Sequence, residues 1–257
     1  MSLSKRLLFL TTTSLPNSLR TRSACSLRTH IIRMYKISLT PEEIDKLEPA
    51  GFTGKIKVIN SLGLDFLRAV RYLKRQKILG FDTESRPTFS SGQPHYGVSL
   101  LQLSGADKAF LFRVKLMGGI PKQLRAILSD ADIIKVGAAV TDDVRGLEKY
   151  DDFPPRGFVD LQKIVWEYGI RDKAVKKMAA NILGIKISKT QQLSNWEAET
   201  LSEAQQAYAA TDAWVCREMY LKLMNSEKHP LTPEQMMPLP PKNAENNDKD
   251  HTQERKG

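Results

Sequence analysis

The chain has 257 residues, enough for one good-sized domain with tails or for two small domains. Hydrophobic residues at 41% and charged residues at 26% predict a soluble globular protein, and no apolar run approaches the roughly 20 residues that span a bilayer. The formal net charge of +10 suits a polyanionic partner. Much of this excess lies in residues 1–33, which contain no Asp or Glu, so the rest of the chain is only mildly basic.

Composition divides the chain into three parts. Residues 1–33 are rich in Ser, Thr, Leu and Arg, as in a mitochondrial transit peptide; a start at Met34 is the other interpretation, and we expect a disordered leader in either case. We predict a folded domain over residues 34–225 and a disordered polar tail over residues 226–257. With two cysteines, one in the leader and one in a predicted helix, no disulfide framework is expected. We therefore expect a cytoplasmic protein, or a mitochondrial one if the leader is a genuine transit peptide.

Hydrophobic patterning predicts alternating strands and helices. Strands are expected at residues 55–59, 78–84, 98–103, 108–112 and 133–137. Helices are expected from Pro41, from Ser61 with Leu62, Phe66, Leu67, Val70 and Leu73 on one face, over residues 121–128, and from near 141 to near 150. Residues 86–94 and 151–157 are expected to be loops. Three or so helices follow, and the last opens with a capping box at Thr200-Leu201-Ser202-Glu203 and runs to about Met224. This order predicts an α/β fold with a mixed central sheet and helices on both of its faces.

Two carboxylates follow a buried strand at Asp82 and Glu84. Side chains alternate along a strand, so both point to the same side. Two like charges roughly 5 Å apart repel by about 3 kcal/mol at an effective dielectric constant of about 20. Such a pair is tolerated if both groups reach open water, if one is protonated, or if a cation lies between them. A strand that simply ends in a turn capped by these acids is the alternative.

Further acids occur later in the chain. Asp143 lies near the start of a predicted helix, where it or Asp142 would complement the helix dipole. Asp212 lies among small and apolar residues of the last helix, where a carboxylate is costly unless it is paired or bound to a metal. Tyr208 lies four residues earlier and so shares its helix face. The alternative is that Tyr208 and Asp212 occupy the exposed side of that helix.

Three short motifs occur in a fixed order along the chain. They are Phe81-Asp82-Thr83-Glu84, Val136-Gly137 followed by Asp143, and Tyr208-Ala209-Ala210-Thr211-Asp212-Ala213. This ordered set resembles the DEDDy branch of the 3′–5′ exonucleases, in particular the Werner-type exonuclease domain and ribonuclease D, over roughly residues 55–224. In the second motif, the spacing from Gly137 favours Asp143 over Asp142.

The resemblance implies a ribonuclease H-like fold and a metal-dependent exonuclease that releases nucleoside monophosphates from a free 3′ end. Its cofactors would be two divalent cations, Mg²⁺ or Mn²⁺, which prefer carboxylate oxygens and water. Asp82, Glu84 and Asp212 would hold one cation, and Asp82 would bridge to a second that Asp143 holds through water. Tyr208 would orient the attacking water. The substrate would be DNA or RNA.

Other residues allow more than one interpretation. The polar loop from Lys189 to Trp196 offers a cation and an aromatic ring that could contact a phosphate and stack on a base. The alternative is an ordinary loop with Trp196 as a core anchor. Lys173, Lys176 and Lys177 predict a solvated helix face, with nucleic-acid contact as the other interpretation.

Two other functions are weighed against an exonuclease. One is a catalytically silent nucleic-acid-binding module on the same fold, and the other is an α/β interaction domain whose acids coincide by chance. The silent module would show a missing acid, and none is missing here. We predict no membrane association and no protein partner.

Overall fold

The computed structural model describes residues 34–88 and 96–237. The predicted leader, residues 89–94 of the first predicted loop and residues 238–257 of the predicted tail lie outside these described residues.

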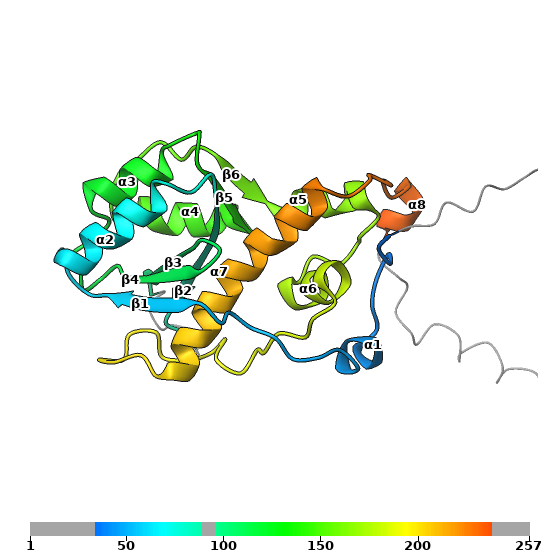
Figure 1. Cartoon of the computed structure of the whole chain (residues 1–257), viewed down its shortest axis with the longest axis horizontal. Helices are drawn as coiled ribbons and strands as arrows, with labels where there is room; N and C mark the ends of the chain where they lie inside the picture. Colours follow the sequence, from blue (N-terminus) through cyan, green and yellow to red (C-terminus); the bar gives the residue numbers. More distant parts are fainter. Residues whose placement is uncertain (1–33, 89–95, 238–257) are drawn as a thin grey trace, which may run out of the picture. The chain divides into compact units, whose positions relative to one another are not determined.

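A mixed sheet of six strands forms the centre of the described structure, in the order β1-β4-β3-β2-β5-β6 (Figure 1). The strands are β1 (Lys55–Ile59), β2 (Ile78–Ser85), β3 (Val98–Ser104), β4 (Lys108–Arg113), β5 (Ile134–Gly137) and β6 (Phe158–Asp160). β3 pairs antiparallel with β2 and β4, whereas the pairs β1–β4, β2–β5 and β5–β6 are parallel. The predicted mixed sheet is confirmed. Strand β6 was missed because three residues are too few for a period-two pattern.

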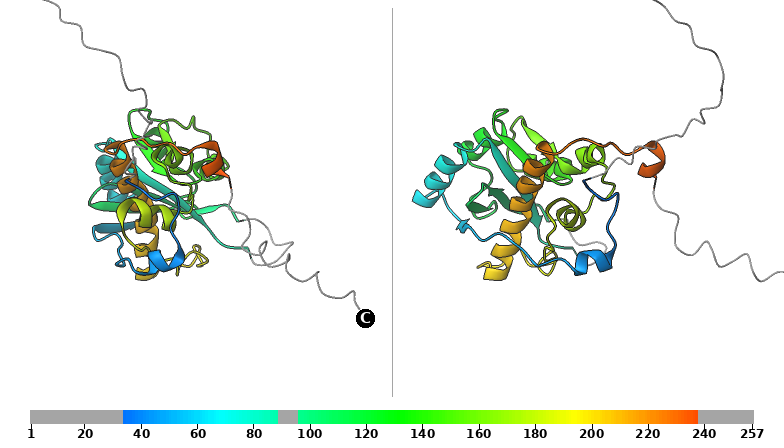
Figure 2. Two further views of the ribbon diagram at one scale, coloured as in Figure 1. Left: turned by 90° about the vertical axis from the view of Figure 1, so that its right-hand side faces the viewer. Right: turned by 45° about the vertical axis from the view of Figure 1, so that its right-hand side comes forward.

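Helices cover both faces of this sheet, as the sequence predicted (Figures 1 and 2). They are α1 (Pro41–Asp45), α2 (Leu64–Leu73), α3 (Lys122–Leu128), α4 (Val140–Glu148), α5 (Leu161–Ile164), the 3₁₀ helix η1 (Val165–Tyr168), α6 (Val175–Leu183), α7 (Glu203–Met224) and α8 (Pro233–Met236). Helices α2, α3 and α4 pack in one core cluster with Leu101 and Leu103 of β3. Leu100, which points to the other face of β3, packs with Ala209 of α7. The same face carries α6, which shares a core cluster with α7.

The predicted apolar face of α2 was partly wrong. Phe66, Val70 and Leu73 are buried, but Leu62 is 58% and Leu67 is 52% exposed. The spacing of four and then three residues places the buried side chains on one stripe of the helix. Leu67 follows Phe66 directly and so points about 100° away from that stripe, whereas Leu62 precedes the helix.

Helix α7 begins two residues later than its predicted capping box implied. Ser202 is the N-cap: its hydroxyl accepts from the backbone N–H of Gln205, and the Gln205 side chain accepts from the N–H of Ser202. The helix ends at Met224, as predicted.

The predicted disordered tail was wrong for residues 226–237. Ser226 hydrogen-bonds Tyr35 at 2.6 Å, and Leu231 is 4% exposed, with its backbone N–H donating to the carbonyl of Trp166. These contacts hold the start of the predicted tail on the folded domain. The boundary predicted at residue 225 is therefore too early.

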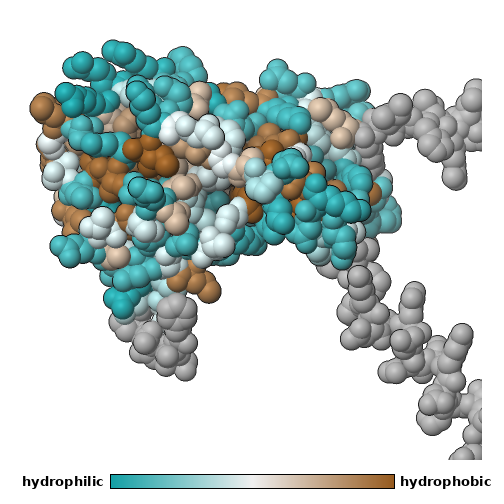
Figure 3. All heavy atoms as spheres, turned by 60° about the horizontal axis from the view of Figure 1, so that its bottom comes forward, coloured by the Kyte–Doolittle hydropathy of each residue, from teal (hydrophilic) through white to brown (hydrophobic). Residues whose placement is uncertain are grey.

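On the face that Figure 3 draws, hydrophilic side chains form most of the margin and apolar residues gather in patches between them. Among the described residues, no helix combines the length and the apolar character needed to cross a membrane.

Candidate active site

Strand β2 and helix α7 cross in direct backbone contact. A Cβ added to Gly80 would lie 1.8 Å from the carbonyl oxygen of Ala213, so only glycine permits this approach. On its side, α7 offers three fully buried alanines, Ala209, Ala210 and Ala213. Because Asp212 precedes Ala213, this crossing carries a carboxylate of α7 to the acids of β2.

Three carboxyl groups meet at this crossing. Asp82 and Glu84 project from one side of β2, and Asp212 reaches them from α7. One oxygen from each of the three lies within 4.8 Å of the others. Hard divalent cations such as Mg²⁺ and Mn²⁺ prefer this kind of all-oxygen donor set.

Burial raises the pKa values of all three groups, and repulsion from other carboxylates adds to the effect on Asp82 and Glu84. Burial places the pKa of Asp82 well above its usual range, and the charges of Asp212 and Glu84 add to this effect. Burial, followed by the charges of Asp212 and Asp143, raises the pKa of Glu84 to about 9, and burial raises that of Asp212 to about 7. Among the described residues, no cationic side chain forms an ion pair with any of the three. A bound divalent cation would supply the missing positive charge, so this group of residues fits a metal.

Asp143 approaches the same cluster from α4. Its carboxylate accepts a hydrogen bond of 2.6 Å from Thr83 of β2, and its charge contributes to the raised pKa values of Asp82 and Glu84. Burial raises the pKa of Asp143 itself to about 6. Asp142 instead points outward, with its side chain 86% exposed and paired with Arg145. The structure therefore brings Asp143, and not Asp142, to the site.

The turn before α4 has an unusual backbone. Ala139 caps this helix at φ 61°, in the left-handed region that disfavours side chains, and its N–H donates to the Asp160 carboxylate at 3.1 Å. This turn takes the chain from β5 into the helix that carries Asp143. Such strain is sustained only where the surroundings impose it.

Tyr208 lies one turn before Asp212 on α7 and donates its phenolic hydrogen to that carboxylate. Burial, followed by the charges of Asp212 and Glu84, raises the pKa of Tyr208 far above its usual value. The phenol therefore holds its proton at neutral pH and acts as a hydrogen-bond donor.

A cleft of about 310 Å³ opens over these groups. Asp82, Glu84, Tyr208 and Asp212 line it together with Lys189. Lys189 is exposed at this cleft, where its charge partly offsets the effect of burial on the pKa of Asp212. Lys176, which the sequence placed on a solvated helix face with nucleic-acid contact as the other interpretation, also lines the cleft.

Trp196 does not line this cleft. The ring is 0% exposed and packs in the core with Leu100, Leu111 and Ala209, at 6.0 Å from the ring of Tyr208. A buried ring cannot stack on a base, so the predicted nucleic-acid contact of Trp196 was wrong, and the core-anchor alternative describes it.

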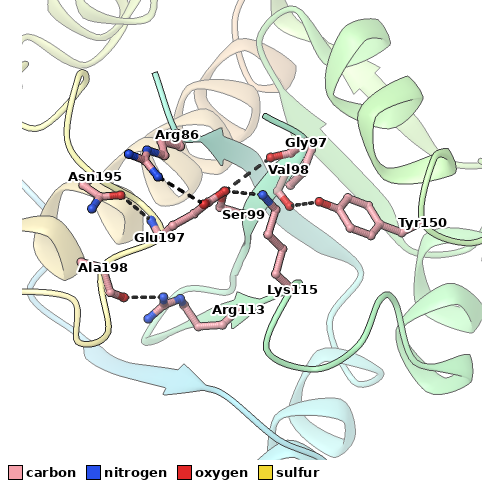
Figure 4. A network of polar contacts seen from close by, with 10 residues as sticks. All are labelled: Arg86, Gly97, Val98, Ser99, Arg113, Lys115, Tyr150, Asn195, Glu197 and Ala198. Carbon is pink, nitrogen blue, oxygen red and sulfur yellow. Dashed lines mark hydrogen bonds and ion pairs between the residues drawn. The ribbon is translucent and has the colours of Figure 1, made fainter. Parts of the chain in front are cut away.

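The loop that carries Trp196 is fixed to the sheet by a polar network (Figure 4). The Glu197 carboxylate accepts from Ser99 at 3.1 Å and from Lys115. The buried guanidinium of Arg113 donates to the carbonyl of Ala198 at 2.6 Å. These contacts hold the loop over β3 and β4, which keeps the indole inside the core.

Gln102 is a polar residue that the sequence did not single out for function. It lies on β3 directly opposite Asp82 and is 0% exposed. Neither polar atom of its side chain has a partner within the described residues. Paired residues on adjacent strands share a sheet face, so an amide lies beside the acidic cluster. The signal was a glutamine inside the apolar run of residues 100–103.

The mixed six-stranded sheet with helices on both faces is a ribonuclease H-like fold, and it carries the acidic cleft. The family model described as 3′–5′ exonuclease matches residues 65–227, so the chain belongs to the 3′–5′ exonuclease family. The family resemblance predicted from the three sequence motifs is thereby confirmed.

Individual relatives agree with this assignment. Exonuclease 3′-5′ domain-containing protein 2 of Drosophila melanogaster is 36% identical over 150 residues, which cover 57% of this chain and 25% of that protein. Ribonuclease D of Gluconacetobacter diazotrophicus is 28% identical over 177 residues, which cover 68% of this chain and 44% of that protein. The solved structure of Escherichia coli ribonuclease D shares the fold, with a TM-score of 0.59 and 24% identity over 66% of this chain and 44% of that chain. This chain thus spans a quarter of the Drosophila protein and less than half of the Gluconacetobacter ribonuclease D.

Proposed function

We propose that this protein is a divalent-metal-dependent 3′–5′ exonuclease that shortens DNA or RNA from a free 3′ end by a two-metal-ion mechanism. The observation that carries the proposal is the meeting of Asp82, Glu84 and Asp212 within 4.8 Å, without a cationic side chain paired to any of them among the described residues. Membership of the exonuclease family supports the reaction type.

Each acid has a defined role in this proposal. Asp82, Glu84 and Asp212 would hold one Mg²⁺ or Mn²⁺, and Asp82 would share a second cation with Asp143. When bound, these cations lower the pKa of the attacking water and neutralise charge on the leaving oxygen. Thr83 keeps the carboxylate of Asp143 in place through its 2.6 Å hydrogen bond.

Two side chains would orient the reacting groups. Tyr208 holds its proton toward Asp212, and its phenol oxygen would accept a hydrogen bond from the attacking water, which orients that water in line with the phosphorus–oxygen bond that breaks. Lys189, exposed at the cleft, would contact the phosphate. Water attacks the terminal phosphodiester, the 3′ oxygen of the preceding nucleotide leaves, and a nucleoside 5′-monophosphate is released.

The test is digestion of 3′-labelled and 5′-labelled single strands of DNA and of RNA, with Mn²⁺ or with EDTA. We expect metal-dependent release of mononucleotides from the 3′ end. Asp82→Ala should abolish release, and Tyr208→Phe should slow it by about 10² or more. Asp142→Ala, which removes the exposed neighbour of Asp143, is the matched control and should retain full activity.

The alternative function is a catalytically silent nucleic-acid-binding module on the same fold. It would bind the same strands but release nothing from either end with either metal. That result would refute the exonuclease and leave the four acids without a catalytic role.

A further inference from the structure

A second pocket is lined in part by residues that directly precede, in sequence, residues lining the acidic cleft. Its volume is about 310 Å³, and its lining combines the cations Lys163, Arg171 and Lys173 with the ring of Trp166 and apolar residues such as Ile170. No Asp or Glu lines it. A pocket with this composition matches a ligand that carries both negative charge and a flat apolar surface.

The three cations of this basic pocket form no ion pair with any described residue. Two of them contact neutral groups: Lys163 donates to the Thr141 hydroxyl at 3.2 Å, and Arg171 donates to the carbonyl of Met237 at 3.3 Å. Lys173 is exposed. Most donor positions of these side chains are therefore open to a ligand.

Neighbouring acids do not compensate this charge, because other lysines already pair with them. Asp172 pairs with Lys177 at 3.1 Å, and Glu167 pairs with Lys228 at 2.5 Å. The pocket therefore carries an uncompensated positive charge that suits a phosphate.

Trp166 is suited to contact a base. The ring is 39% exposed, although tryptophan is usually well buried. Its indole N–H donates to the carbonyl of Lys163 at 2.9 Å, which fixes the ring before any ligand arrives. A fixed and exposed ring is a platform on which any base can stack.

Consecutive residues connect this pocket to the acidic cleft. Lys173 lines the pocket, and the next three residues, Ala174, Val175 and Lys176, line the cleft. They form the start of α6, whose N-cap Ala174 offers no side-chain hydrogen bond. Free backbone N–H groups and the positive end of the helix dipole therefore lie between the two cavities, where a phosphate would be favoured.

We propose that this basic pocket binds an upstream nucleotide of a single strand whose 3′ end occupies the acidic cleft, with the start of α6 contacting the phosphates between them. The inference rests on the proposed exonuclease function for the polarity of the strand. It predicts that strands long enough to reach the pocket bind more tightly than a dinucleotide, which fills the cleft alone.

The test compares a dinucleotide with a ten-nucleotide single strand, for the full chain and two variants. Lys173→Ala combined with Arg171→Ala removes two cations of the pocket, and Trp166→Ala removes the ring. The matched control, Lys74→Ala with Arg75→Ala, removes two exposed cations at the end of α2, on the other face of the sheet. Melting curves establish that each variant is folded, and Lys173→Glu alone serves if the double variant is not.

We expect each pocket variant to raise KM for the ten-nucleotide strand about tenfold and to leave kcat and the dinucleotide KM unchanged. Binding in EDTA, followed by fluorescence anisotropy, should lose about 0.7 of its logarithmic salt slope for each phosphate contact removed. An unchanged KM and salt slope for the long strand, or equal losses for both lengths, would overturn the proposal. Because anisotropy needs no cleavage, a protein without exonuclease activity would still show whether the pocket binds the strand.

Discussion

Replacing Gly80 by alanine tests whether the crossing of β2 and α7 assembles the site. The added Cβ would lie 1.8 Å from the oxygen and 2.5 Å from the carbon of the Ala213 carbonyl, and real Cβ atoms essentially never approach within 3.0 Å. The obstacle is backbone, which cannot swing aside as a flexible side chain would. Strand and helix must therefore separate by about 1 Å, and this displaces Asp212 from Asp82.

Two magnitudes follow from this displacement. Misplacing reacting groups by about 1 Å costs on the order of 10² in rate. Overpacking in a core costs about 1–3 kcal/mol of unfolding free energy, which lowers Tm by roughly 2–12 °C for a domain of this size. The loss of activity should thus far exceed what the fraction of unfolded protein explains.

The assay measures Tm, the Tm shift caused by Mn²⁺, and kcat on a 3′-labelled strand. Gly63→Ala is the matched control, because a Cβ there meets nothing within 4 Å. Gly63 is the N-cap of α2, so this change should cost under about 1 kcal/mol and leave kcat unaltered. A Gly80→Ala protein with the Tm, metal response and kcat of the parent would refute the idea that the close crossing positions the acids.

Three further predictions concern the acidic cluster itself. Mn²⁺ at 100 times its dissociation constant should stabilise the protein by about 2.7 kcal/mol. Asp212→Asn should remove most of this stabilisation and Asp142→Asn none of it. Equal stabilisation of the two variants by Mn²⁺ would contradict the assigned site. In EDTA, the unfolding free energy should be highest near pH 4 and decline as the pH rises through 7 and 9. The reason is that the folded state keeps protons on Asp212, with a pKa of about 7, and on Glu84, with a pKa of about 9, whereas the unfolded chain has released them. A Tm that instead rises over this pH range would show that these pKa values are not raised. Gln102→Met, which removes a buried amide without a partner among the described residues, should stabilise the metal-free protein by about 1–3 kcal/mol, and a loss of stability would mean that the amide is hydrogen-bonded.

The sequence predicted those parts of the site that depend on local order along the chain. Asp82 and Glu84 follow a recognisable buried strand, and Tyr208 and Asp212 share one helix face by their spacing. Spacing from Gly137 also favoured Asp143 over its neighbour. Each of these inferences needs only the period of a single element, which the residues themselves carry.

Other features depend on which elements become neighbours. The place of Gln102 beside Asp82 follows from the register of β3 on β2, which no single strand encodes. The burial of Trp196 follows from the packing of its loop on β3 and β4, so a polar stretch of sequence concealed a core residue. Strand β6 forms against β5, and its paired residues lie 23 positions earlier in the chain, as Gly137 does from Asp160. Local patterning cannot detect such a partner.

Packing, rather than charge pairing, holds the carboxyl groups together. Ionised groups at this separation would repel by several kcal/mol, and no described cationic side chain pairs with Asp82, Glu84 or Asp212. What offsets the repulsion is the close contact of Gly80 with the alanine face of α7, which is fully buried and so does not depend on salt. Removing metal should therefore leave α7 in place on β2 and protonate the acids. The acids therefore keep their positions without a cation, and a cation that binds must displace protons from them. Because of this competition, metal affinity should increase as the pH rises.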